Sequence, residues 1–327
     1  MNRLLTYGSV EAIPFYNCSW KSLEEWEASG VQRPLLGIPI TITGIVIELL
    51  YIPVIFIIFK TKLIKLTCYK IMTFLALNDM AATVVSSIIT GPLLTRGAVF
   101  CSNPTLIYIV GSFGLSTWCC SCAVTVSLFF NRIICIGFKE YADCLEKKMA
   151  YTYMIICVFY MFYITFFTPA ACFNSFIMAW ISDPLSEKEP SQEAAAWYEN
   201  DAQSLNNGIY VIVMFALFTI YYILVKKLAH GQKSKAARSI FIQCSIICFL
   251  NTVTAVVYNA LKFIPLAPWI LVFCQWCWTF NHGAPAIIYL TMNDTIRREF
   301  KKLMFGKTSN KVDDRSSIAT GKSTSKI

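Results

Sequence analysis

Residues 36–59 read LGIPITITGIVIELLYIPVIFIIF, a run in which Glu48 is the one charged residue. At about 1.5 Å of rise per residue, such a helix is long enough to cross a hydrocarbon core of about 30 Å. Because a backbone in lipid must satisfy its own hydrogen bonds, the run predicts a transmembrane helix. Six similar apolar runs follow, at residues 69–93, 104–136, 149–173, 208–229, 239–263 and 268–292. The sequence therefore predicts an all-α membrane protein with a seven-transmembrane helix bundle, and a composition of 56% hydrophobic and 14% charged residues agrees.

Basic residues are divided unequally between the two sides of this bundle. Of the 28 lysines and arginines, 22 lie at Arg132, in the tail from residue 293, or in the loops 60–70, 137–149 and 226–238. The positive-inside rule then predicts an extracellular N-terminus, a cytoplasmic C-terminus and a plasma-membrane location. The net charge of +9 reflects this topology and attraction to an anionic inner leaflet, so we expect the lipid bilayer and not nucleic acid as a partner.

Three segments follow from the same pattern. Residues 1–35 are expected to form an extracellular N-terminal arm, residues 36–305 the transmembrane domain, and residues 306–327, rich in Ser, Thr and Lys, a disordered cytoplasmic tail. No cleavable signal peptide is visible, so the first span is expected to act as its own insertion signal. Asn17-Cys18-Ser19 is a glycosylation sequon in the predicted arm.

Most of the 14 cysteines fall inside the predicted helices, where they are expected to behave as small buried apolar residues. Cys18, Cys101 and Cys172 are predicted to lie at the oxidising outer surface, where they allow at most one internal bridge. The sequence does not determine the pair, and we favour Cys101 with Cys172. With only His230 and His282 in the chain, a seven-helix membrane hydrolase with a histidine-based zinc site is disfavoured, so we expect no metal, no cofactor and no enzymatic activity.

The seventh run ends in Tyr289-Leu-Thr-Met-Asn293, and the pattern then becomes amphipathic. Apolar residues recur at the spacing of one helix face, and Arg and Lys occupy the other. Asp294 suits the positive N-terminal end of a helix and Gly306 suits its termination. These features predict a short surface helix over 294–305, and the alternative is a basic flank of the kind that stops membrane transfer.

Ionisable groups inside the predicted spans should face the bundle interior, because a charge at mid-bilayer costs at least about 2.5–3.5 kcal/mol. Asp79 is the strongest of these groups, with Asn281 and His282 as its predicted partners; Glu48 is a weaker one. Asp79 is interpreted either as part of a polar cluster that binds a cation or protons, or as a protonated carboxyl with one neighbour.

Asn131-Arg132 follows a long uncharged run at the inner end of the third span. Arg132 is either an interface anchor that extends toward water or a switch residue that meets a cytoplasmic partner in one state. Aromatic residues concentrate in the outer half, and of these Trp118, Tyr258 and Trp276, together with His282, are the candidate ligand-pocket residues. An interfacial aromatic belt is the alternative and fits Trp269 better.

Leu75-x-x-x-Asp79, Asn131-Arg132 and Tyr289-x-x-x-Asn293 resemble, in order and placement, the motifs of rhodopsin-like G-protein-coupled receptors. A narrower similarity, to the nematode serpentine chemoreceptors of class T, is carried by the stretches PFYNCSW, RPLLGI, TCYKIMTFLALNDM, TGPLLTRGAVFC, PTLIYIVG, WCCSC and FNR. This resemblance implies a chemosensory receptor, found in sensory cilia, that binds a small molecule or peptide and activates a heterotrimeric G protein. It also implies an activation switch made of Asp79, Asn131, Arg132, Asn281 and Tyr289.

Departures from the receptor pattern concern the switch and the outer loops. Asn131 replaces the acidic residue that usually precedes the arginine, and Pro285 lies one residue early relative to Tyr289. The loop 174–207 lacks the cysteine that usually pairs with the top of the third helix. The alternative function is a ligand-gated channel or small-solute carrier, although the chain shows neither repeat symmetry nor a ring of like charge.

Overall fold

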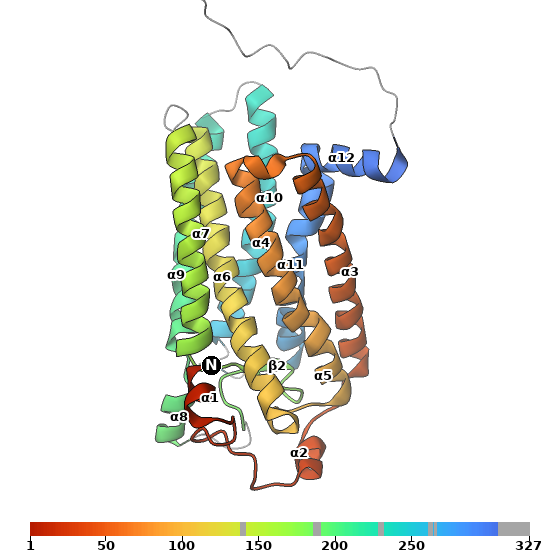
Figure 1. Ribbon diagram of the computed structural model, residues 1–327, viewed down its shortest axis with the longest axis vertical. Helices are drawn as coiled ribbons and strands as arrows, with labels where there is room; N and C mark the ends of the chain where they lie inside the picture. Colours follow the sequence, from red (N-terminus) through yellow and green to blue (C-terminus); the bar gives the residue numbers. More distant parts are fainter. Residues whose placement is uncertain (138–141, 186–190, 228–231, 261–263, 265–266, 307–327) are drawn as a thin grey trace, which may run out of the picture.

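The computed structural model describes residues 1–137, 142–185, 191–227, 232–260, 264 and 267–306. In these residues seven helical rods run side by side in one bundle, as Figure 1 shows. The rods are α3 (Pro34–Lys60), α4 (Thr67–Thr83) continued into α5 (Thr90–Arg96), α6 (Pro104–Gly137), α7 (Ala142–Phe167), α9 (Asp201–Lys227), α10 (Gln232–Ala260) and α11 (Pro268–Met292). Their number and order confirm the predicted helix bundle.

Five of these rods, judged by length and composition within the described residues, are long and apolar enough to cross a membrane: α3, the α4–α5 rod, α6, α7 and α9. The apolar part of α10 is the shorter segment Ser245–Ala260. In α11, buried polar side chains such as Gln275, Asn281 and His282 interrupt the apolar sequence.

Two predicted boundaries are wrong. The fourth run was expected to continue to residue 173, but α7 ends at Phe167, since Pro169 disfavours helical backbone in the residue before it. The following loop was expected to reach residue 207, whereas α9 begins at Asp201, with an acidic residue in its first turn. Hydropathy alone missed this polar first turn.

The α4–α5 rod contains a π-helical turn, η2 (Val84–Ile89), where backbone hydrogen bonds join residues five apart instead of four. Pro92 lies just beyond it and lacks the N–H that an α-helix would direct at residue 88. The Thr90 hydroxyl donates to the Val85 carbonyl at 2.6 Å and so satisfies one acceptor at this turn.

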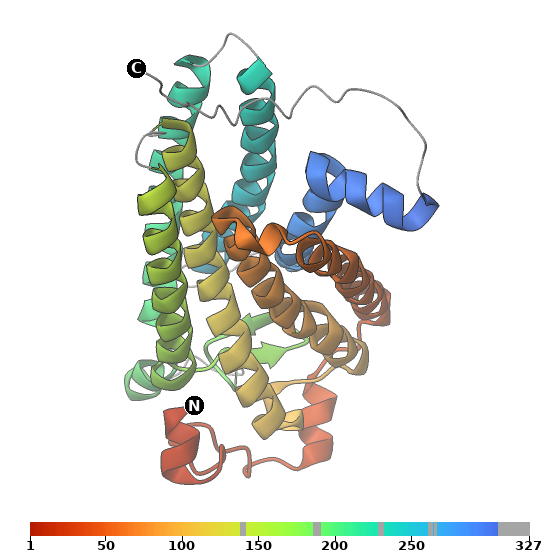
Figure 2. The ribbon, with the colours of Figure 1, turned by 45° about the horizontal axis from the view of Figure 1, so that its top comes forward.

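One end of the bundle is covered by a cap, which we define as the segment 1–33, the loop 97–103, the hairpin of β1 (Cys172–Asn174) and β2 (Ala179–Ile181), and α8 (Gln192–Tyr198). Figure 2 shows the N-terminal helices α1 (Asn2–Tyr7) and α2 (Leu23–Ser29) at this end, far from α12. The two strands pair antiparallel, with Phe173 opposite Trp180. The segment before α3 is thus folded onto the bundle.

Buried aromatic rings hold the cap together. Tyr16 packs edge-on against Tyr108 and Tyr198, each with ring centroids 5.5 Å apart. The Tyr198 hydroxyl donates to the Phe15 carbonyl at 2.6 Å, and burial raises the pKa of Tyr198 to about 12. The Arg33 guanidinium donates to two carbonyls of the hairpin turn, those of Ser175 (3.0 Å) and Phe176 (3.2 Å). The N-terminal segment therefore positions the β-hairpin.

A disulfide joins Cys18 to Cys101, across 83 residues of sequence. The favoured pair of Cys101 with Cys172 is wrong. Cys172 is a buried free cysteine in β1, where its neighbours in the hairpin and α6 cover it. The bridge fixes the N-terminal segment to the short helix η3 (Phe100–Ser102) that precedes α6. Asn17, the sequon residue beside this bridge, is exposed.

At the opposite end, α12 (Asp294–Phe305) turns away from the axis of α11, as Figure 1 shows. The Asn293 side chain caps it by accepting from the Ile296 amide at 3.1 Å, and Gly306 ends it with a positive φ of 71°. Ile296 is buried and Phe300 is partly buried against the bundle, whereas Leu303 and Met304 further along the apolar face are 44% and 60% exposed. The predicted helix over 294–305 is confirmed; of the predicted tail, residues 307–327 lie outside the described residues.

Candidate ligand cavity and central polar cluster

A cluster of polar side chains lies at the centre of the bundle, around Asp79 of α4. The Asp79 carboxylate is 2% exposed and His282 of α11 is fully buried. Asp79 Oδ1 accepts from Ser121 Oγ of α6 at 2.8 Å and lies 2.9 Å from His282 Nδ1. Asp79 Oδ2 accepts from the Tyr51 hydroxyl of α3 at 3.2 Å. One carboxylate thus connects four helices, and an ionised Asp79 requires the histidine proton on Nδ1.

Further contacts fix the partners of Asp79. The Tyr51 hydroxyl also lies 2.6 Å from the carbonyl oxygen of His282, which brings α3 and α11 together. Gly283 permits this approach, since a Cβ there would lie 2.5 Å from Ile47 Cδ1. Asn78 Nδ2 donates to Ser121 Oγ at 2.7 Å and so orients the serine. The side chains that contact Asp79 are thus themselves held in place by further contacts.

The predicted partners of Asp79 are confirmed in part. His282 contacts the carboxylate directly, whereas the buried Asn281 side chain bonds no other group of the described residues through its oxygen. Three donors, from Tyr51, Ser121 and His282, already lie within hydrogen-bond distance of the Asp79 carboxylate, so a cation there would compete with them. Among the described residues, no three His, Cys, Asp or Glu side chains are grouped so that they could hold a metal ion.

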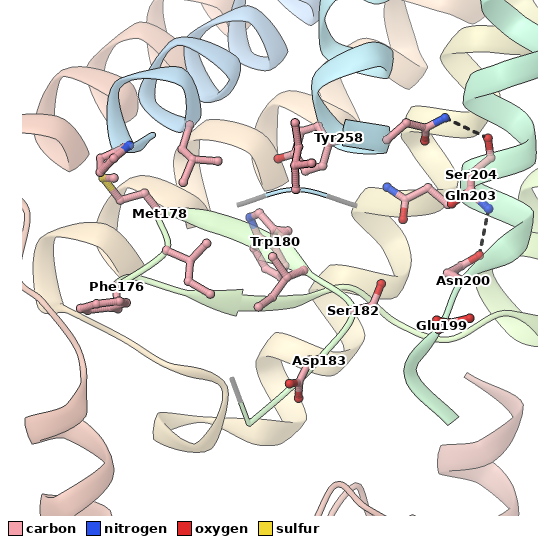
Figure 3. A pocket seen from close by; sticks show the side chains of 16 residues that line it. Phe176, Met178, Trp180, Ser182, Asp183, Glu199, Asn200, Gln203, Ser204 and Tyr258 are labelled. Carbon is pink, nitrogen blue, oxygen red and sulfur yellow. Dashed lines mark hydrogen bonds between the residues drawn. The ribbon is translucent and has the colours of Figure 1, made fainter. Parts of the chain in front are cut away.

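A hollow at the capped end has a volume of about 570 Å³, which is within the usual range for small-molecule sites. We call it the cap cavity; the β-hairpin with the residues after it, α9, α10 and the start of α11 line it. Figure 3 shows Trp180 on the hairpin, Gln203 and Ser204 on α9, and Tyr258 on α10 around it. Its walls combine aromatic rings with amide, hydroxyl and carboxylate groups, so it suits a ligand with both apolar and polar parts.

A narrow slot of about 30 Å³ lies next to the cap cavity and shares Trp180, Gln203 and Tyr258 with it. Trp118 and Trp278 line this tryptophan slot deeper in the bundle. Its volume holds only a few non-hydrogen atoms, so it could take only a small part of a ligand.

Trp118 connects the slot to the central cluster. Its ring meets that of His282 edge-on with centroids 6.3 Å apart, and its Nε1 donates to Asn207 Oδ1 at 2.9 Å. Trp278 contacts His282 in a similar way, at 6.5 Å. A ligand that moves either indole therefore acts on a direct neighbour of the Asp79–His282 pair.

The sequence-predicted pocket residues are placed unevenly. Tyr258 lines both hollows, and Trp118 lines the slot. His282 lines neither of them and contacts the ring of Trp118. Trp276 lines neither hollow and stacks on Phe280 at 5.5 Å. Sequence reasoning did not select Trp180 or Trp278 for the pocket. The polar residues Gln275, Asn281 and His282 are expected to face the bundle interior, and position 278 lies on the same helix face, so this spacing could have indicated Trp278 over Trp276.

The inner switch residues are placed near the uncapped end. Asn131 is buried beside Ser127 in a small hollow of about 10 Å³, and neither side-chain oxygen bonds another described group. The backbone of Arg132 belongs to α6, and its side chain lies outside the described residues. Tyr289 is buried among the apolar residues at this end of α11. The structure does not bring Asn131 or Tyr289 into the hydrogen bonds around Asp79.

Residues 3–313 match the family model of the serpentine type 7TM GPCR chemoreceptor Srt. The chain belongs to this family. Serpentine receptor class T-55 of Caenorhabditis elegans is 27% identical to it over 297 residues, which cover 88% of this chain and 80% of that relative. The family is described as having seven transmembrane helices, which agrees with the seven rods, whereas length and composition alone select five of them as membrane spans. The chain is therefore a multi-pass membrane chemoreceptor, and its family is a receptor family rather than an enzyme family.

Proposed function

We propose that this Srt receptor binds a chemical ligand in the cap cavity and activates a heterotrimeric G protein. The observation that supports this most is the continuity from the cap cavity through Trp118 to His282 and Asp79. A ligand that prefers one position of Trp118 would favour one arrangement of the four helices joined at Asp79. The ligand is a small molecule or a short peptide of unknown identity.

The opposite end of the bundle is proposed as the G-protein side. Its loops carry most of the basic residues, and the segments 138–141 and 228–231 of these loops lie outside the described residues. Asn131, Arg132 and Tyr289 occupy the inner ends of α6 and α11, where a change in helix packing would reach the partner.

The orientation is proposed with the cap outside the cell and α12 at the cytoplasmic surface, in the plasma membrane and in sensory cilia. The charge distribution supports it, as does the exposed sequon at Asn17 next to a disulfide. Glycosidase treatment of the expressed protein should reduce its apparent mass, and Asn17→Gln should abolish that reduction. An epitope tag at the amino end that stains only after permeabilisation would contradict the orientation.

The test of function is a response in heterologous cells. Cells that express the receptor at the surface are exposed to pools of odorants and peptides, with and without a blocker of G-protein signalling. We expect an active pool whose response disappears under the block. A response that survives the block would instead support the channel or carrier alternative.

A further inference from the structure

Gln203 lies at the junction between the cap cavity and the tryptophan slot, and it lines both of them. It is the third residue of α9, and its backbone N–H donates to Asn200 Oδ1 at 2.9 Å, which caps the first turn of the helix. Asn200 Nδ2 in turn donates to the carbonyl oxygen of Pro169, just after α7, at 2.8 Å. The backbone that carries Gln203 is therefore fixed by the cap of its own helix and by the chain after α7.

The side-chain amide of Gln203 faces the cavity. A glutamine at this helix position commonly reaches back to the N–H of the capping residue, but here the amide bonds no group of the described residues, and Figure 3 shows it directed into the cap cavity. The amide of Asn259 in the same wall is used within the protein. Its Nδ2 donates to the Ser204 carbonyl and its Oδ1 accepts from Asn207, each at 3.2 Å. Gln203 thus offers a donor and an acceptor side by side to a ligand.

The Gln203 amide favours a ligand that satisfies both of its groups, because a polar group that loses water without gaining a partner costs free energy. A lactam or a primary carboxamide matches it, since the N–H and the C=O of such a group lie side by side in one plane. A carboxylic acid presents the same pair only when it is protonated. Its ionised form would meet the carboxylates of Asp183 and Glu199 on the described lining of the cavity. The matching group is therefore a neutral amide.

Aromatic rings beside Gln203 limit the shape of the ligand. Trp180 and Tyr258 line both hollows with it. On the α6 side of the slot, a Cβ at Gly111 would lie 1.7 Å from the carbonyl oxygen of Ala171, so backbone closes the slot there. A flat ring stacks well on indole and phenol rings, whereas the slot takes only a small substituent. The matching ligand is thus flat where it passes Gln203.

We propose that Gln203 is the specificity-determining residue of the cap cavity and that its ligand is a flat, neutral lactam or primary carboxamide. The ligand C=O accepts from Gln203 Nε2, and the ligand N–H donates to Gln203 Oε1. This inference rests on the proposed ligand site in the cap cavity. It makes no use of the G protein, so a binding measurement tests it separately from signalling.

The test uses the full-length receptor in nanodiscs, with tritium-labelled 2-quinolinone, a flat lactam, as the probe. Uptake by nanodiscs without receptor is subtracted. We expect saturable binding that unlabelled 2-quinolinone competes at least about tenfold better than N-methyl-2-quinolinone, which keeps the carbonyl but lacks the N–H. Quinoline-2-carboxylate, an anion of similar shape, should compete as weakly as the N-methyl compound. The absence of saturable binding would overturn the proposal, as would equal competition by the N-methyl compound or the carboxylate.

Gln203→Met keeps the length of the side chain and removes its amide, so we expect it to weaken the binding of 2-quinolinone about tenfold. Gln192→Met is the matched control, because Gln192 is exposed on α8 and lines neither hollow. We expect the control to bind with wild-type affinity. Wild-type affinity in Gln203→Met would refute the pairing, and so would an equal loss in the two variants.

Gln203→Glu provides a test that a folding defect cannot imitate. A carboxylate accepts hydrogen bonds and donates none, so it matches protonated 2-aminoquinoline, which offers two N–H donors side by side. We expect the ratio of the affinity for 2-quinolinone to that for 2-aminoquinolinium to fall at least about tenfold in this variant. An unchanged ratio would contradict the pairing. A changed ratio in a receptor that drives no nucleotide exchange would uphold the pairing and contradict only the proposed signalling.

Discussion

His282 Nδ1 lies 2.9 Å from Asp79 Oδ1, and this contact joins α11 to α4 across 203 residues of sequence. Both side chains are buried, and Tyr51 and Ser121 complete the coordination of the carboxylate from two further helices. Trp118 touches His282 from the side of the tryptophan slot. The pair is thus the point at which the proposed ligand site meets the contacts that hold the four helices together.

Ser121→Ala should destabilise the receptor by about 1–3 kcal/mol, because it removes one buried hydrogen-bond partner from Asp79 and one from Asn78. The matched control is Ser127→Ala on the same helix, whose hydroxyl bonds no described group. We expect it to stay within about 0.5 kcal/mol of wild type. Thermal unfolding of the purified proteins in detergent measures both, and equal losses in the two variants would refute the role of the cluster.

Loss of the Cys18–Cys101 bridge should be costly, because it ties the N-terminal segment to the entry of α6. Cys18→Ser and Cys101→Ser should each lower stability by about 2–5 kcal/mol and reduce surface expression. The double variant should be no worse than either single one, since one bond is lost in all three. A double variant with twice the loss would show that the two cysteines act separately.

Cys172 should be an unreactive thiol in the folded protein. Burial raises the pKa of this thiol, so little thiolate is present at pH 8, and its side chain is covered by the cap. Maleimide should label Cys172 only after denaturation. Labelling of Cys172 in the native receptor, or its recovery in a disulfide-linked peptide with Cys101, would contradict the structure.

Hydropathy predicted the bundle well because each rod must present about 20 apolar residues to lipid. Hydropathy could not predict features that depend on which residues meet in the folded protein, such as the disulfide pair. The partner of Cys101 depends on the fold of residues 1–33, which carry no apolar run. A local signal for part of that fold was present: Ser22-x-x-Glu25 is a capping box, and both of its hydrogen bonds start α2.

The central site was predicted in part for a similar reason. Ionisable side chains within a membrane span face the bundle interior. Asp79 and His282 could therefore be predicted from their residue types and their positions within the spans. Tyr51 was not recognised as a partner, because a tyrosine in an apolar run gives no sign of which way it faces. The same ambiguity favoured Trp276 over Trp278 in α11.

Trp118→Phe should reduce the maximal response to an active ligand without changing surface level. The substitution keeps a ring in the slot. It removes the N–H that donates to Asn207, and the smaller ring makes less contact with His282. Trp269→Phe is the matched control, since Trp269 is 71% exposed at the start of α11. Concentration–response curves in the same cells compare them, and an identical loss in both would remove Trp118 from the coupling path.

Ligand-dependent nucleotide exchange tests the proposed function most directly. Purified receptor is reconstituted into vesicles with a heterotrimeric G protein, and GTPγS uptake is measured with and without a ligand from an active pool. The account predicts faster exchange on ligand addition, and less of it with Trp118→Phe than with Trp269→Phe. Exchange no faster than in vesicles without receptor, together with a ligand-evoked ion flux across the same vesicles, would contradict it.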